Sequence, residues 1–337
     1  MRCERPGPGR LSYGHMYAPS PAAPRQRRRR VLVSALCASL LVAATVVTLT
    51  AKSRPEPKDR PPDVASPVEL GDRVGSYTAL FPLRSGYRPP SREERAAVRA
   101  GVMDVLDGRI DSARSRLGHV GYTVRTMRLK GSERAVAEIA EREGEDTGRG
   151  WGRVYVDLSR SARFSVQVPH PRADMNSELM GAELFAKTPG AVLVLAGANR
   201  FAGQGKEADM AHQARSVFNA VCAALTARGL PGVQLHGFAN ESSPGNDVVL
   251  SPGVTEPGPE IRRAARLISD AGLRTCRTWV RSCGQLEGTT NVQGRDAAAH
   301  GIPFLHVENS HTVRTDAAGR SAVVDALDEA ARGWNGR

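Results

Sequence analysis

The sequence predicts a three-layer α/β domain, with helices on both faces of a mostly parallel central sheet, preceded by one N-terminal transmembrane helix. From about residue 91, segments with helical and strand-like patterns alternate along the chain, which is typical of this fold class. The run AVLVLAG at 191–197 is continuously apolar, as expected of a parallel strand covered on both faces. The uncharged apolar segment 31–51 has the length of about 20 residues that a helix needs to cross a bilayer.

The residues before the apolar segment indicate its orientation. The arginines of RQRRRR at 25–30 directly precede it, and such charges hold that end of a membrane helix in the cytoplasm. Residues 1–30 are rich in Pro, Arg, Gly and Ala and are expected to form a disordered cytoplasmic tail. The alternative is a signal peptide with a long basic region, cleaved to leave a secreted protein. In both cases the rest of the chain lies outside the cytoplasm.

The remaining chain divides into a linker and a folded domain. Residues 52–75 are expected to form the linker, because five prolines between 52 and 68 stiffen that stretch. Residues 76–337 are expected to form the α/β domain, whose first helix begins at Ser91 with Glu94 in the capping-box position. The helices are expected at 91–117, 132–143, 176–187, 208–229, 259–272, 291–300 and 319–332. The strands are expected at 121–129, 152–158, 163–168, 191–197, 232–238, 247–251, 273–280 and 303–309.

The charge distribution argues against a nucleic-acid-binding protein. The net charge is +12, but residues 1–60 hold twelve Lys/Arg and three Asp/Glu, so +9 lies there and +3 remains for the other residues. The domain therefore lacks the basic surface that binding phosphates requires. Aromatic residues make up 5% of the chain, which leaves few platforms on which bases could stack. We also find no P-loop and no dinucleotide-binding fingerprint.

Two cysteines of the domain lie close together in sequence. Cys276 and Cys283 bracket RTWVRS, a segment short enough to be closed by a disulfide in an oxidising compartment. Two buried thiols are the alternative. Because the sequence has no C-x-x-C pair, a structural zinc ribbon is not expected.

Ionisable residues follow the predicted strands at the positions where α/β sheets collect functional groups, the carboxyl ends. His170, His236 and Glu308 each follow or end a different strand, and Asp174 and Glu178 come shortly after the first of them. Two histidines and one carboxylate are the usual ligands of a catalytic zinc ion, and a second carboxylate near the metal serves as general base. We therefore expect His170, Asp174 and His236 to bind one Zn²⁺, with Glu178 as the alternative carboxylate ligand and Glu308 as the base.

Each of these residues also has a purely structural interpretation. A single histidine at a strand end is commonly a hydrogen-bonded structural residue. Asp174 has the chemistry of a helix N-cap, and Glu178 falls in a first helical turn, where the helix dipole favours an acid. Glu308 is near Arg314 in sequence and could pair with it. Arg200, at another strand end, could clamp a substrate carboxylate through two hydrogen bonds or form a surface salt bridge.

Four motifs together resemble a known family. PHPRAD, QLHGF, the Gly-rich CGQLEGTTNVQGR and HVENSHTVR follow one another, in this order, over roughly residues 160–320. In this respect the chain resembles the N-formylglutamate amidohydrolase family and the wider zinc carboxypeptidase-like group, which includes poly-γ-glutamate hydrolases. The resemblance implies a phosphorylase/hydrolase-like α/β fold, a single zinc ion and hydrolysis of amide bonds.

The resemblance also implies roles for single residues. His170 and His236 match the histidine ligands, and Glu308 matches the catalytic glutamate. Asp174 best matches the carboxylate ligand, although the family usually has Glu there, and Glu178 is its rival. The small residue that follows His236 is Gly, whereas Ser is commoner in the family.

Together these observations predict a membrane-anchored, extracytoplasmic zinc amidohydrolase or peptidase. It would cleave an amide bond in a small peptide or an N-acyl amino acid by means of metal-activated water. The alternative is a non-catalytic module that kept the fold and binds a cell-envelope peptide. A metal-free serine hydrolase is not predicted, because the sequence lacks a G-x-S-x-G motif.

Overall fold

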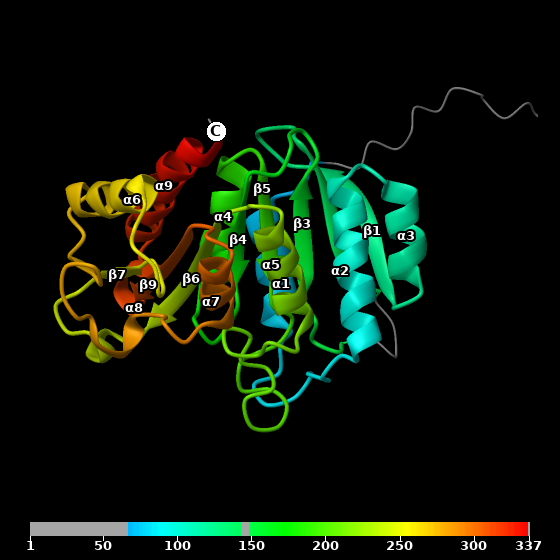
Figure 1. The fold of residues 1–337 in the computed structure, drawn as a ribbon, viewed down its shortest axis with the longest axis horizontal. Coiled ribbons are helices and arrows are strands. Elements are labelled where there is room, and N and C mark those ends of the chain that lie inside the picture. The colour runs from blue at the N-terminus through cyan, green and yellow to red at the C-terminus, as the bar shows by residue number, and fades with distance from the viewer. Residues whose placement is uncertain (1–66, 143–147, 336–337) are drawn as a thin grey trace, which may run out of the picture. The chain divides into compact units, whose positions relative to one another are not determined.

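Figure 1 shows the fold in a computed structural model, which describes residues 67–142 and 148–335. These residues belong to one of two units into which the chain divides, 61–337. The predicted cytoplasmic tail, the apolar segment 31–51 and the linker up to residue 66 lie outside the described residues. Within the part of the chain that is described, no helix is both long and apolar enough to cross a membrane.

The centre of the domain is a mixed sheet. Its strands are β1 (Tyr122–Arg128), β2 (Ala135–Glu141), β3 (Arg153–Asp157), β4 (Phe164–Val168), β5 (Ala191–Leu195), β6 (Gly232–Phe238), β7 (Val248–Ser251), β8 (Thr275–Arg277) and β9 (Phe304–Ser310). The described residues form nine strands in the order β1-β2-β3-β5-β4-β6-β9-β7-β8. The four central strands β5, β4, β6 and β9 are parallel, whereas β3 pairs with β5 and β7 with β9 in antiparallel fashion.

The α/β class is therefore confirmed, but the prediction of a mostly parallel sheet holds only for the four central strands and for the β7–β8 pair at one edge. Strands β1, β2 and β3 follow one another as antiparallel neighbours. The connection from β1 to β2 is too short for a crossover, which takes a dozen or more residues, so these strands can pair only in opposite directions.

Helices cover both faces of the sheet (Figure 1). They are α1 (Leu70–Ala79), α2 (Arg92–Leu106), α3 (Ile110–Gly118), α4 (Ser177–Lys187), α5 (Val217–Ala227), α6 (Pro259–Asp270), α7 (Val292–Ala299), α8 (His311–Thr315) and α9 (Ala317–Asn335), with 3₁₀ turns η1 (Asn240–Ser242) and η2 (Gly284–Leu286). Val166 and Val168 of β4 share a core with α1, α4, α6 and α9. Val192 and Val194 of β5 share a second core with α2, α3 and α5. The domain thus has the three layers that the sequence predicts.

The helix predicted at 132–143 is wrong, because this segment contains strand β2. Its alanines and glutamates favour a helix, but helix propensity is a weak preference that packing overrides. β2 lies between β1 and β3, so its backbone groups are paired on both sides. The buried carboxylate of Glu138 forms ion pairs with Arg73 and Arg153, which offsets the loss of water around its charge.

Two further predicted helices are shorter in the structure. The helix expected at 91–117 is divided at Gly108, whose φ of 75° suits glycine, into α2 and α3. Its start is confirmed, since Ser91 and Glu94 form the expected capping box. The helix expected at 208–229 begins only at Val217, and the residues before it form turns.

At the beginning of the domain, the structure adds helix α1, which the sequence did not predict. It begins at Leu70, ahead of the expected boundary at residue 76. Leu70 and Val74 are fully buried in the core shared with α4 and α9, so this helix belongs to the domain and not to a linker.

Cys276 and Cys283 form a disulfide, so they are not two buried thiols. The disulfide ties the middle of β8 to Cys283, the residue directly before η2. Cys222, on α5, is a buried free cysteine.

Candidate metal centre

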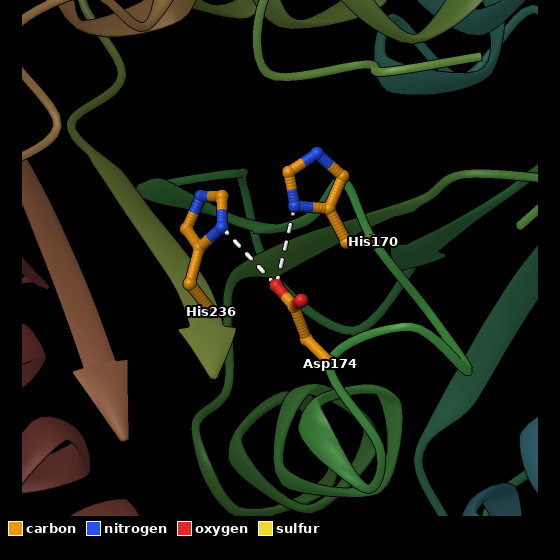
Figure 2. Close-up of side chains that lie close together, drawn as sticks. All are labelled: His170, Asp174 and His236. Atoms are coloured by element: carbon orange, nitrogen blue, oxygen red, sulfur yellow. Dashed lines mark hydrogen bonds and ion pairs between the residues drawn. The ribbon is translucent and has the colours of Figure 1, made fainter. Parts of the chain in front are cut away.

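Three neighbouring parallel strands bring the predicted site residues to one edge of the sheet. β4, β6 and β9 lie side by side, and the carboxyl ends of parallel strands meet at the same edge. His170 follows β4 by two residues, and His236 of β6 is paired in register with Glu308 of β9. Figure 2 shows His170, Asp174 and His236 pointing toward one another at this edge.

The three side chains are spaced as ligands of one metal ion. Asp174 Oδ2 lies 3.2 Å from His170 Nδ1 and 3.3 Å from His236 Nδ1. The three candidate ligand atoms all lie within 4.8 Å of one another, and all three residues are buried. Two donors bound to a tetrahedral zinc ion at about 2.0–2.1 Å are about 3.3 Å apart. The donor set and its spacing therefore fit a zinc ion.

The loop after β4 aims Asp174 at the histidines. The backbone N–H of Asp174 donates to the His170 carbonyl at 2.9 Å, and this hydrogen bond closes one turn of the loop. Arg172 and Asn176 both have φ of 68°, so the loop passes twice through the left-handed region. Asn176 occupies the N-cap position of α4, and this helix has no side-chain cap. Asp174 is thus not the cap of the following helix.

His170 is held from its outer side by a carboxylate. Its Nε2 lies 2.7 Å from Asp209 Oδ1, while its Nδ1 faces Asp174. Arg200 donates through Nη2 to the other oxygen of Asp209 at 2.9 Å, and His212 Nδ1 lies 3.2 Å from Oδ1. A proton on Nε2, donated to Asp209, leaves the Nδ1 lone pair of neutral His170 directed into the site.

His236 is held from its outer side by an amide. Its Nε2 lies 2.9 Å from Gln234 Oε1, an oxygen that also accepts a hydrogen bond from Asn291 Nδ2 at 2.6 Å. Gln234 Nε2 donates to Gln167 Oε1 at 3.2 Å and to Gln293 Oε1 at 3.0 Å. Because its amide nitrogen is occupied by two acceptors, Gln234 must present its oxygen to His236. The proton of His236 therefore sits on Nε2, and Nδ1 is free to bind a metal.

The electrostatics of the site favour the protonation states that bind metals. Burial opposes ionisation of Asp174, but His170 and His236 outweigh it and hold the pKa of its carboxyl well below the usual range. Burial and the neighbouring His306 lower the pKa of His236 to about 4. Burial also opposes protonation of His170, but Asp174 and Asp209 together raise its pKa above the ordinary value. At neutral pH Asp174 is thus anionic and His236 is neutral, as metal ligation requires.

Glu308 lies next to His236 across the β6–β9 pair and is largely buried. Its Oε1 is 3.4 Å from His306 Nε2, and its Oε2 is buried without a hydrogen-bond partner among the described residues. Arg314, the alternative partner in the sequence, donates instead to backbone carbonyls.

Two predicted residues lie outside the group of candidate ligands. Glu178, the alternative carboxylate ligand, is buried in the first turn of α4, where its Oε1 is 3.5 Å from the hydroxyl of Thr78 on α1. Burial raises the pKa of Glu178. Arg200 contacts the site indirectly, through its ion pair with Asp209, and its side chain stays 30% exposed.

Three residues around the histidines were missed from the sequence: Asp209, Gln234 and Asn291. Gln234 precedes His236 by two residues on the same strand, so the period of two places both side chains on one face, a signal that could have identified it. Asp209 lies in a segment of turns that the sequence composition presents as a helix. Asn291 lies within the Gly-rich motif CGQLEGTTNVQGR, which was singled out from the sequence without a role for this residue.

No family model matches the chain, and no curated protein matches it. Among solved structures, it is similar to N-formylglutamate amidohydrolase from Ralstonia eutropha JMP134, at 13% identity and a TM-score of 0.37, covering 54% of this chain and 96% of that one. It is also similar to the catalytic domain of CwlV, an N-acetylmuramoyl-L-alanine amidase from Bacillus (Paenibacillus) polymyxa var. colistinus, at 11% identity and a TM-score of 0.35, covering 51% and 98%.

A third similar structure is an aspartoacylase family protein from Mesorhizobium loti, at 9% identity and a TM-score of 0.36, covering 57% of this chain and 66% of that one. The solved structures similar to this chain thus include an N-formylglutamate amidohydrolase, a member of the family that the sequence motifs resemble. The similarity concerns the fold.

Proposed function

We propose that this chain is a zinc-dependent hydrolase of amide bonds, with His170, His236 and Asp174 as the metal ligands. The observation that carries the proposal is the convergence of two imidazole Nδ1 atoms on one carboxylate oxygen, at 3.2 and 3.3 Å. Both imidazoles have an acceptor on the opposite ring nitrogen, so their lone pairs face inward. A purely structural histidine pair would not need this arrangement.

The residues have the donor chemistry of a catalytic zinc site. His170, His236 and Asp174 would hold the zinc ion, which when bound would supply Lewis-acid chemistry toward a carbonyl group and toward water. His170 and His236 would bind through Nδ1 and Asp174 through Oδ2. Asp209 and Gln234 hold the two imidazoles in orientation from outside.

Glu308 is the proposed general base. It lies next to His236 across the β6–β9 pair, and its Oε2 has no hydrogen-bond partner within the described ranges. Glu178 also has an unpartnered buried oxygen, but of these two carboxylates only Glu308 is in register with His236, so only Glu308 is placed to accept a hydrogen bond from a molecule at the site. In this role Glu308 takes a proton from the attacking water and then gives it to the departing amine.

Arg200 is proposed to orient the substrate. Its guanidinium is anchored on one side by Asp209, next to His170, and its side chain remains 30% exposed. A guanidinium presents several N–H donors in a plane, so Arg200 can pair with Asp209 and still meet a carboxylate of the substrate.

The proposed substrate is a small peptide or an N-acyl amino acid. The relatives' names include an N-formylglutamate amidohydrolase and an N-acetylmuramoyl-L-alanine amidase, both of which act on amide bonds. We further propose that residues 31–51 hold the enzyme in the membrane with its domain outside the cytoplasm, or are cleaved to release it. An exported enzyme would meet cell-envelope peptides, and nucleic acids are not expected among its partners.

Release of free amine from a panel of N-formyl and N-acyl amino acids and of α- and γ-linked glutamyl peptides tests this proposal. The full-length protein should release amine with zinc, lose this activity in EDTA and regain it when zinc is restored. The variant Glu308→Gln should bind zinc as the wild type does and turn over about 10²–10⁴-fold more slowly.

Two results would count against the proposal. Equal rates for the wild type and Glu308→Gln would remove Glu308 from the role of base. A zinc-loaded protein that binds these peptides without releasing amine would instead be the non-catalytic module.

A further inference from the structure

Arg314, on the short helix α8, is a buried cation whose guanidinium is occupied by backbone carbonyls. The residue is 4% exposed. Its Nε donates to Asn309 O at 3.0 Å, its Nη1 to Met175 O at 2.7 Å and its Nη2 to Phe238 O at 2.9 Å. The three acceptors come from three separate segments of the chain, so this one side chain links all of them.

These three segments are the ones that carry the candidate site. The carbonyls that Arg314 binds come one or two residues after Asp174, His236 and Glu308. The loop of Asp174 is tied to α8 a second time, since Asn176 Nδ2 donates to the Arg314 carbonyl at 2.8 Å. β6 and β9 are paired with each other up to Phe238 and Ser310, whereas the loop of Asp174 lies beyond the end of β4 and needs other contacts to keep its position relative to them.

Gly237 provides independent support for a site shaped around this guanidinium. A Cβ atom at this position would lie 2.1 Å from Arg314 Nε and 2.4 Å from its Cζ, far inside van der Waals contact. Gly237 lies within β6 and is not among the residues with positive φ, so its backbone does not require glycine. The close approach of Arg314 is what excludes a side chain from the position directly after His236.

We infer that Arg314 is a positioning residue, which fixes the loop bearing Asp174 against the ends of β6 and β9, the strands that bear His236 and Glu308, and so builds the metal centre. The inference rests on the proposed function for its link to zinc. It assigns to Gly237 the role of admitting the guanidinium. Charge is a second contribution, because Arg314 attracts the carboxylates of Asp174 and Glu308.

The zinc dissociation constants of Arg314→Ala, Arg314→Lys, Gly237→Ala and the double variant Gly237→Ala/Arg314→Ala test this inference in the full-length protein. Loss of an outer contact of this kind weakens metal binding by about 10–100-fold, which is the loss expected for Arg314→Ala and Gly237→Ala. Arg314→Lys keeps the charge but loses the planar guanidinium with its several N–H donors. Its zinc affinity should therefore be closer to that of Arg314→Ala than to that of the wild type. In the double variant, Gly237→Ala should add no loss of zinc affinity beyond that of Arg314→Ala, because the guanidinium with which the new Cβ would clash is absent.

Arg134 offers a matched control. It also donates to two backbone carbonyls, those of Phe185 and Ala186, and pairs with Asp157 at the opposite end of the sheet. Arg134→Ala should lower the melting temperature as Arg314→Ala does, and leave zinc affinity unchanged. Wild-type zinc affinity in Arg314→Ala, or equal losses in Arg314→Ala and Arg134→Ala, would overturn the inference.

Hydrogen exchange separates failure of this inference from failure of the proposed function. If the wild type itself binds no zinc, the proposed function fails, and amide exchange of the metal-free protein decides the role of Arg314. Faster exchange in Arg314→Ala at 171–176, 237–241 and 309–313 together, with no such change in Arg134→Ala, would support its linking role. Unchanged exchange in these three segments would overturn it.

Discussion

His236 Nε2 lies 2.9 Å from Gln234 Oε1, and this pair determines which nitrogen of His236 faces the metal site. The orientation of the Gln234 amide is itself fixed, since its Nε2 donates to Gln167 and Gln293. A network of neutral amides thus selects the tautomer that presents Nδ1 to Asp174. On the other side of the site, a carboxylate, Asp209, does the same for His170.

Replacing Gln234 should weaken zinc binding more than replacing its neighbour in the network. Gln234→Met removes the acceptor of His236 Nε2 and should raise the zinc dissociation constant by about 10–100-fold. Gln293→Met breaks the same network without touching His236. Both variants leave buried amides unpaired and should lose about 1–3 kcal/mol of stability.

A competition titration against a chromophoric chelator measures the zinc affinity, and thermal unfolding measures the stability. Equal zinc affinities in Gln234→Met and Gln293→Met would show that Gln234 does not set the tautomer of His236.

Asp174 and Glu178 should respond in opposite ways to loss of charge. Asp174→Asn removes the one carboxylate oxygen that both imidazoles face, so equimolar zinc should no longer be retained. Glu178→Gln should bind zinc as the wild type does, because this side chain faces Thr78. Burial already raises the pKa of Glu178, so a neutral isostere should not lower the stability at pH 7. Zinc content after gel filtration distinguishes the two variants, and loss of zinc from Glu178→Gln alone would reverse the assignment.

Zinc affinity should depend on pH through His170. Asp174 keeps a strongly depressed pKa and His236 titrates at about 4, so above pH 5 both are already deprotonated. The pKa of His170 is raised, so this ligand loses its proton last as the pH increases. The logarithm of the association constant should therefore rise by about one per pH unit and level off above the pKa of His170. A slope near two over the same range would mean that both histidines titrate together.

Asp209→Asn should shift the pH dependence of zinc affinity to lower pH. The carboxylate of Asp209 helps to raise the pKa of His170, so without it the zinc association constant should stop rising at a lower pH. NMR titration of the His170 ring in the metal-free variant measures the same change directly. At high pH the variant should still bind zinc more weakly, because the partner that orients His170 is weaker. An unchanged pKa of His170 would exclude Asp209 as the source of the shift.

Much of this arrangement could be predicted from the sequence, because it depends on local patterns. The apolar runs predicted the central strands, and their carboxyl ends predicted where His170, His236 and Glu308 would meet. The capping box at Ser91 was also predicted correctly, since it depends on residues three apart.

The rest depends on contacts between distant residues. Strand β2 has a helical composition and is a strand because it pairs on both sides, with β1 and β3, and Arg73 and Arg153 neutralise its buried Glu138. Asp209 reaches His170 from a segment of turns 39 residues further along the chain. No pattern in either segment reports such a partner. The choice between Asp174 and Glu178 likewise depended on the two left-handed residues in the loop after β4.

X-ray absorption spectroscopy at the zinc edge of the zinc-loaded protein tests the central claim most directly. It should show one zinc ion per chain with two imidazole nitrogens and carboxylate oxygen at about 2.0–2.2 Å. In His236→Ala the signature of one imidazole should disappear. A wild-type protein that retains no zinc at equimolar concentration, or that binds it with fewer than two imidazoles, would contradict the account.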